Sequence, residues 1–95
     1  MRRTRYLLAY DIRDPRRLRR VHKVATAFGT ALQYSVFVCD LTVGELCDLR
    51  GALRDVMHFG EDSAMFVPLG DGYDASCFEF LGPAPSLPGG GSVIV

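Results

Sequence analysis

Residues 6–29, YLLAYDIRDPRRLRRVHKVATAFG, decide the fold of this chain. The run at 6–12 is apolar on both of its alternating faces over most of its length, which is typical of a central strand covered on most of its surface. Asp14 and Pro15 then have the pattern of a helix start, an N-cap followed by the first helical residue. Apolar residues recur at helical spacing after it, at Leu18, Val21, Ala25 and Phe28. The stretch therefore predicts a strand followed by a helix that ends at Gly29.

Four further elements follow this strand and helix. They are strands at 33–41, 64–69 and 77–81 and a helix from 43 to about 58. Thr42 and Glu45 have the spacing of a capping box at the start of the second helix, and Gly60 follows its end. We assign these elements to an α+β domain of the split βαβ type, the ferredoxin-like βαββαβ plait. In that fold two helices cover one face of a four-stranded antiparallel sheet.

The C-terminal part is predicted to lie outside this domain. We divide the chain into a ferredoxin-like domain at 1–81, a Pro/Gly linker at 82–91 and a C-terminal strand at 92–95. The strand contains three β-branched residues, Val93, Ile94 and Val95. Such residues favour a pleated, half-buried surface. A sheet with two apolar faces and helices on only one of them favours a homodimer. The sheet of each protomer also has an open edge, so we expect this strand to be exchanged across the dimer onto the edge of the partner's sheet. A strand on the chain's own sheet or a frayed tail is the alternative.

The composition bounds the class of protein. The 95 residues allow one domain, and 48% hydrophobic with 23% charged residues is typical of a folded globular chain. The apolar runs are far shorter than the roughly 18 residues of a membrane span, and the N-terminal apolar run is too short for a signal peptide. We therefore expect a cytoplasmic protein with no membrane partner. Three cysteines without a CxxC pair argue against a disulfide framework and against a zinc site.

The basic residues are concentrated near the N-terminus although the net charge of the chain is zero. Residues 1–23 carry nine of the eleven basic residues and two acids, a net charge of +7, and residues 24–95 carry −7. Such an asymmetry points to an anionic partner, most often nucleic acid. The predicted nucleic-acid-binding residues are Arg13, Arg16, Arg17, Arg19, Arg20 and Lys23. The helix dipole disfavours cations in the first turns, so phosphate contact is the favoured reason for these arginines, and a solvated helix surface is the alternative.

Asp11 is the candidate catalytic and metal-binding residue because it lies at the C-terminal end of the first predicted strand. A carboxylate at this place is either a ligand for a metal ion or a local cap of the turn that follows. One carboxylate seldom holds Mg²⁺, so a two-fold axis near Asp11 would supply the second. Asp14 is interpreted as a helix cap, and His22 and His58 are interpreted as structural residues. The sequence shows no nucleophile–base pair, no aromatic RNP1 run in the predicted third strand and no glycine-rich phosphate loop near the first strand.

Several motifs occur in a fixed order between residues 8 and 42. They are Tyr10-Asp11-Ile12, the basic run from Arg16 to Lys23, Phe28-Gly29, Gln33 to Phe37, and Leu41-Thr42. In this order and spacing they resemble the CRISPR-associated protein two family, the smaller of the two universal spacer-acquisition proteins. The later runs MFVPL and VIV look like the third strand and the swapped last strand of that family.

The resemblance implies a ferredoxin-like homodimer of prokaryotic adaptive immunity that helps to capture foreign DNA together with a larger CRISPR integrase protein. It also implies an endonuclease of RNA or double-stranded DNA that depends on Mg²⁺, with Mn²⁺ as an alternative cation. In that family each protomer contributes the aspartate matched here by Asp11 as the metal-binding and catalytic residue. A non-catalytic scaffold that binds nucleic acid and bridges integrase subunits is the alternative function.

Overall fold

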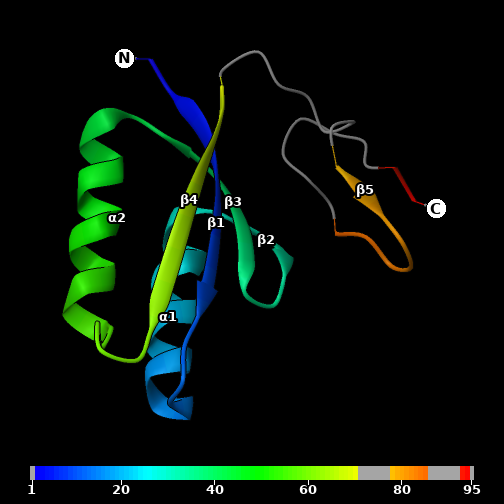
Figure 1. Cartoon of the computed structure of the whole chain (residues 1–95). Coiled ribbons are helices and arrows are strands. Elements are labelled where there is room, and N and C mark those ends of the chain that lie inside the picture. Colours follow the sequence, from blue (N-terminus) through cyan, green and yellow to red (C-terminus); the bar gives the residue numbers. More distant parts are fainter. Residues whose placement is uncertain (1, 71–77, 86–92, 95) are drawn as a thin grey trace.

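The computed structural model describes residues 2–70, 78–85 and 93–94 (Figure 1). Its elements, in chain order, are β1 (Thr4–Asp11), α1 (Pro15–Phe28), β2 (Thr30–Gln33), β3 (Val36–Leu41), α2 (Val43–Val56), β4 (Ser63–Gly70), β5 (Glu79–Phe80) and β6 (Val93–Ile94). Strands β1 to β4 form one antiparallel sheet in the order β2-β3-β1-β4. Both helices lie on the same side of that sheet (Figure 1). The predicted α+β, ferredoxin-like βαββαβ fold is therefore confirmed for the run from β1 to β4. The predicted elements taken in chain order give βαβαββ, and the order βαββαβ arises because the segment 33–41 contains two strands.

Two of the predicted strands are wrong in detail. The segment 33–41 is a hairpin rather than one strand, because β2 ends at Gln33, a turn follows at Tyr34 and Ser35, and β3 begins at Val36. The apolar alternation continues through this turn without a Gly, Pro or Asn, so the pattern hides it. The segment 77–81 does not join the main sheet, since β5 pairs with β6 in a separate two-stranded sheet.

The helix ends follow local signals. Asp14 caps α1 by accepting a hydrogen bond from the backbone N–H of Arg17 at 2.9 Å. Thr42 and Glu45 form the predicted capping box at the start of α2. Helix α2 ends at Val56, slightly earlier than predicted, because the backbone of Met57 is extended. The two helices therefore begin where the sequence places them.

Gly29 ends α1 for a different reason than the usual left-handed cap. Its backbone is extended, with φ of −158°, so any residue could adopt it. A Cβ atom at this position would lie 2.5 Å from Cys39 Sγ and 2.5 Å from the carbonyl oxygen of Val38. Glycine is required here because α1 turns into β2 against the backbone of β3.

The main core lies between the helices and the sheet. Leu8 of β1 is opposite Phe37 of β3 and Phe66 of β4, and it is fully buried. The helices contribute the buried residues Val21 and Leu49 to the same cluster. Alternate residues of β1 therefore anchor the sheet to both helices, and the residues between them face the other side.

The second face of the sheet is also apolar, and we call it the open face. Leu32 and Val38 are buried there against Phe80 of β5, so the C-terminal segment covers the β2 and β3 side. On the β4 side Met65 is 57% exposed and is opposite Ala9 in the β1–β4 register. The open face therefore keeps an exposed apolar area toward the end of β1 that carries Asp11.

The predicted C-terminal strand is present as β6, which pairs in parallel with β5 of the same chain. Val95 and part of the 82–91 linker lie outside the described residues. Exchange of this strand between two protomers is a property of a dimer and stays a prediction. In the part of the chain that the structure describes, neither helix is long and apolar enough to cross a membrane.

Candidate metal and nucleic-acid site at the end of β1

Asp11 is the last residue of β1 and pairs in register with Ser63, the first residue of β4. It belongs to the set of alternate β1 residues that includes Ala9, so it lies on the open-face side of the sheet. Its side chain is 67% exposed, and it forms an ion pair with the Arg13 guanidinium at 3.4 Å. The structure thus presents a solvent-accessible carboxylate at the strand end where the sequence places it.

One chain does not complete a metal centre around Asp11. Among the described residues, no group of three or more His, Cys, Asp or Glu side chains is arranged to hold a metal ion. Mg²⁺ commonly uses one or two protein carboxylates and takes its remaining oxygen ligands from phosphate and water. A single Asp11 can therefore supply one carboxylate ligand, and a second carboxylate would come from another protomer.

A buried carboxylate that no sequence motif reveals holds the loop after Asp11. The side chain of Asp62 is fully buried and accepts hydrogen bonds from the backbone N–H groups of Arg13 and His58, both at 2.9 Å. It also accepts two hydrogen bonds from the Arg17 guanidinium, at 2.7 and 3.1 Å. Asp62 therefore fastens the β1–α1 loop to the α2–β4 loop, and we call this pair with Arg17 the loop clamp.

The electrostatics of the loop clamp follow from these contacts. Hydrogen bonds from Arg17 and from the two backbone N–H groups hold the pKa of Asp62 well below its usual range. In turn, Asp62 and the neighbouring Glu61 raise the pKa of Arg17. Arg17 is predicted to bind nucleic acid, but its side chain is committed to these two acids. No short motif signals the contact, because Arg17 and Asp62 are far apart in sequence.

The other cations of α1 lie on one exposed surface. Arg16, Arg19, Arg20 and Lys23 line a shallow surface hollow of about 420 Å³, and we call these four residues the α1 basic face. Unlike Arg3, Arg5 and Arg17, which pair with acids, they form no ion pair within the residues that the structure describes. Unpaired, exposed cations on one helix face are suited to the phosphate backbone of a nucleic acid.

Both histidines make local structural contacts. His22 stacks on Tyr34, with ring centroids 5.0 Å apart, and its Nδ1 lies 3.1 Å from the hydroxyl of Tyr10. That hydroxyl donates to the carbonyl oxygen of Tyr34, and burial raises the pKa of Tyr10 to about 12. His58 accepts a hydrogen bond from the backbone N–H of Gly60. These contacts support the structural interpretation of both residues.

Comparison with known proteins places these features in a family. A family model described as "CRISPR associated protein Cas2" matches residues 4–77. These residues include β1 to β4 and the loop clamp. The chain belongs to the Cas2 family. This confirms the resemblance inferred from the motifs between residues 8 and 42.

Cas2 relatives match over most of the chain. A Synechocystis protein named CRISPR-associated endoribonuclease Cas2 3 is 37% identical, covering 95% of this chain and 97% of its own length. A Thermus thermophilus protein named CRISPR-associated endonuclease Cas2 2 is 34% identical, covering 84% of this chain and 83% of its own.

Solved structures agree with the Cas2 assignment. The crystal structure of the hypothetical protein TT1823 from Thermus thermophilus superposes with a TM-score of 0.75 at 30% identity, covering 87% of this chain and 95% of that one. Streptococcus pyogenes Cas2 at pH 6.5 superposes with a TM-score of 0.65 at 34% identity, covering 70% of this chain and 86% of that one.

Proposed function

We propose that this protein is a CRISPR adaptation protein that acts as a homodimeric, Mg²⁺-dependent endonuclease on the phosphodiester bonds of RNA or double-stranded DNA. One observation carries the proposal: the exposed carboxylate of Asp11 ends β1, and the helix with the α1 basic face follows directly. The endonuclease and endoribonuclease names of the relatives support the same reaction class.

The open face supports a homodimer that brings two Asp11 residues together. Met65 is exposed and opposite Ala9, and Asp11 and Ser63 lie two register positions further along the same strand pair. An exposed apolar area on a small sheet favours association with a second copy. A two-fold axis near this strand end would therefore place the two Asp11 carboxylates on one shared site.

The donors present fit Mg²⁺, or Mn²⁺, when two chains are counted. The two Asp11 carboxylates would hold the cation together with phosphate oxygens of the substrate. When bound, the cation supplies Lewis-acid polarisation of the phosphodiester and makes a bound water more acidic. The α1 basic face binds and orients the backbone of the nucleic acid. The loop clamp holds the backbone N–H of Arg13, two residues after Asp11, and thereby fixes the backbone of the loop that follows this carboxylate.

The second candidate function is a non-catalytic scaffold that binds nucleic acid and bridges subunits of a CRISPR integrase protein. One observation favours it: the α1 basic face is complete within one chain, whereas the described residues of one chain do not complete the metal site. In both functions we propose that the chain works with the larger integrase protein.

The substitution Asp11→Asn separates the two functions. We expect metal-dependent cleavage of RNA and duplex DNA to fall to the metal-free background, because the amide keeps the shape of the side chain and removes the charge that holds a cation. Binding of duplex DNA should persist. Cleavage is measured with Mg²⁺, with Mn²⁺ and with a chelator, and Asp55→Asn, an exposed acid of α2, is the matched control.

Full cleavage by the Asp11→Asn protein would move the activity away from this site. A wild-type protein that binds duplex DNA but cleaves neither substrate with any cation would establish the scaffold instead.

A further inference from the structure

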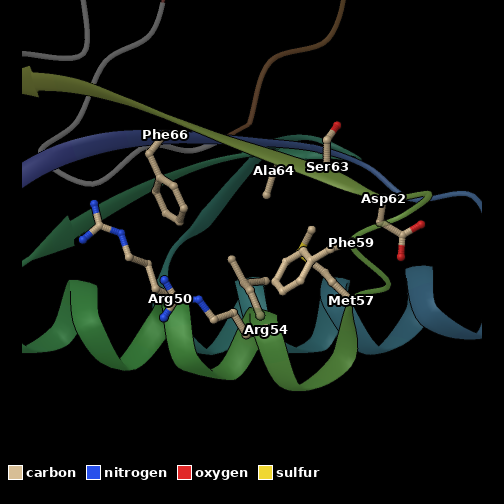
Figure 2. Close-up of a pocket in the computed structure, with 9 residues that line it drawn as sticks. Arg50, Arg54, Met57, Phe59, Asp62, Ser63, Ala64 and Phe66 are labelled. Carbon is tan, nitrogen blue, oxygen red and sulfur yellow. The ribbon is translucent and has the colours of Figure 1, made fainter.

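A second surface with nucleic-acid chemistry lies between α2 and β4. A hollow of about 340 Å³ separates the end of the helix from the edge strand, and we call it the α2–β4 groove. Its lining includes Arg50, Arg54, Met57, Phe59 and Phe66. Figure 2 shows Phe66 extending from β4 and the two arginines from α2, with the ring of Phe59 between the two layers.

The charge of the groove is unusual for this part of the chain. Residues 24–95 contain two basic residues and carry a net charge of −7, and both basic residues, Arg50 and Arg54, line the groove. They are one helical turn apart and form no ion pair within the described ranges 2–70, 78–85 and 93–94. Asp62 also borders the groove, but its carboxylate points away from it and belongs to the loop clamp (Figure 2).

The groove also offers aromatic surfaces. Phe59 is 67% exposed, although a phenyl ring usually prefers burial. The guanidinium carbon of Arg50 is 5.8 Å from the centre of the Phe66 ring. Of the two rings Phe59 is the exposed one, since Phe66 is partly buried against the core. An exposed aromatic ring next to arginines that form no ion pair is the combination with which proteins bind unpaired bases and their phosphates.

We propose that the α2–β4 groove binds an unpaired segment of nucleic acid, with a base stacked on Phe59 and neighbouring phosphates on Arg50 and Arg54. The proposal rests on the proposed function only in taking nucleic acid as the ligand class. An acidic peptide would also suit the two arginines, but it gives no reason for an exposed aromatic ring beside them. Ser63, on the rim of the groove, pairs in register with Asp11, and its side chain points away from α2 (Figure 2). A segment held in the groove therefore lies on the opposite face of the sheet from the candidate cleavage residue, near the same end of β4.

Fluorescence anisotropy with two probes, a short labelled oligothymidylate and a blunt labelled duplex, tests the proposal. Phe59→Leu keeps the apolar bulk and removes the aromatic face, so it should weaken oligothymidylate binding by roughly fivefold to a hundredfold. Phe59→Tyr keeps the ring and should bind like the wild type. Arg50→Gln with Arg54→Gln should reduce the salt dependence of single-strand binding by about 1.4 in the log–log slope, about 0.7 for each phosphate bound.

Val43→Ala is the matched control, because Val43 is an exposed residue of α2 outside the groove lining. Duplex binding should stay unchanged in the Phe59 variants. If Phe59→Leu binds oligothymidylate as tightly as the wild type, the stacking site does not exist. If an aspartate-rich peptide binds through Arg50 and Arg54 while oligothymidylate does not, the groove is a protein-docking surface and the proposal is overturned.

The two proposals fail separately. Loss of the proposed function would appear as absent duplex binding or absent cleavage, with single-strand binding still dependent on Phe59. If the groove does not bind nucleic acid, the wild type and the Phe59→Leu protein would bind single strands equally tightly, with duplex binding intact.

Discussion

Asp62 connects stability to pH through a single buried carboxylate. Its hydrogen bonds from Arg17 and from two backbone N–H groups lower its pKa from the ordinary value of 3.8. Between the lowered value and the ordinary one, the unfolded chain binds a proton that the folded protein does not, so the free energy of unfolding decreases as the pH falls through this window. Above the ordinary pKa the full contribution of the clamp is present.

The substitution Asp62→Asn should therefore lower the free energy of unfolding near neutral pH and flatten its decline in acid. Urea unfolding measured at a series of pH values checks both effects. Asp48→Asn, an exposed acid of α2, serves as the control and should behave like the wild type. Equal acid dependence in the wild type and the Asp62→Asn protein would show that another group governs acid unfolding.

Alanine substitutions at two glycines are expected to change the free energy of unfolding in opposite directions. Gly29→Ala would force a Cβ atom to within 2.5 Å of Cys39 Sγ and the Val38 carbonyl, and we expect a loss of about 1–3 kcal/mol in unfolding free energy. Gly51→Ala lies within α2 with open space around the added atom, and we expect a gain of about 0.5–1 kcal/mol. Thermal and urea unfolding compare the two. Similar effects of both substitutions would contradict the close approach of α1 and β3.

At the scale of an element, α1 carries the binding surface for duplex DNA in the proposed function. Charge reversal of Arg16 and Arg20 to Glu should weaken duplex binding strongly and reduce its dependence on salt, by about 0.9 in the log–log slope for each phosphate that is no longer bound. Arg16→Lys with Arg20→Lys keeps both charges and should retain most of the affinity. Anisotropy titrations over a range of salt concentrations measure both variants. Unchanged duplex affinity after charge reversal would remove the α1 basic face from the binding surface.

Elements with local signals can be predicted from the sequence, and contacts between distant residues cannot. The starts of α1 and α2 follow from Asp14-Pro15 and from the Thr42–Glu45 capping box, which involve neighbouring residues. The turn at Tyr34 and Ser35 lacks a Gly, Pro or Asn, so the pattern there predicts one strand instead of a hairpin. The role of Arg17 depends on Asp62, which follows 45 residues later and contacts it through the fold rather than through local sequence.

In the candidate site, too, the features set by local sequence can be predicted, and those that depend on distant residues cannot. The position of Asp11 at a strand end follows from the apolar run before it, and the structure keeps it exposed there. The exposed cations of α1 follow from helical periodicity, which separates them from the buried stripe. The α2–β4 groove joins a helix face to an edge strand and to a loop aromatic, and no single segment of sequence contains that combination.

At the scale of the whole molecule, we expect the C-terminal segment to determine how two copies associate. The β5–β6 ladder pairs Glu79 with Val93 and Phe80 with Ile94, and a two-stranded ribbon is marginally stable by itself. Removal of the residues after Gly82 deletes β6. If β6 adds to the edge of the partner's sheet as predicted, this truncation should weaken the homodimer. Sedimentation at micromolar concentration compares the truncated and full chains, with circular dichroism to confirm folding.

The control for the truncation is the full chain with Val43→Ser, which removes an exposed apolar side chain from α2. A truncated chain that dimerises as tightly as the full one would leave the open face as the sole interface.

The loop clamp has a consequence for the interpretation of genetic data on this protein. A mutational scan scored on adaptation or cleavage would rank position 62 beside position 11, although the buried carboxylate of Asp62 is held by Arg17 and backbone amides and has no access to a substrate. Position 17 would score with them for the same reason and would be mistaken for a contact to nucleic acid. A mutational scan of this chain therefore needs a parallel measurement of protein abundance. A lower amount of folded protein and a lower activity per molecule would give the same score at these three positions.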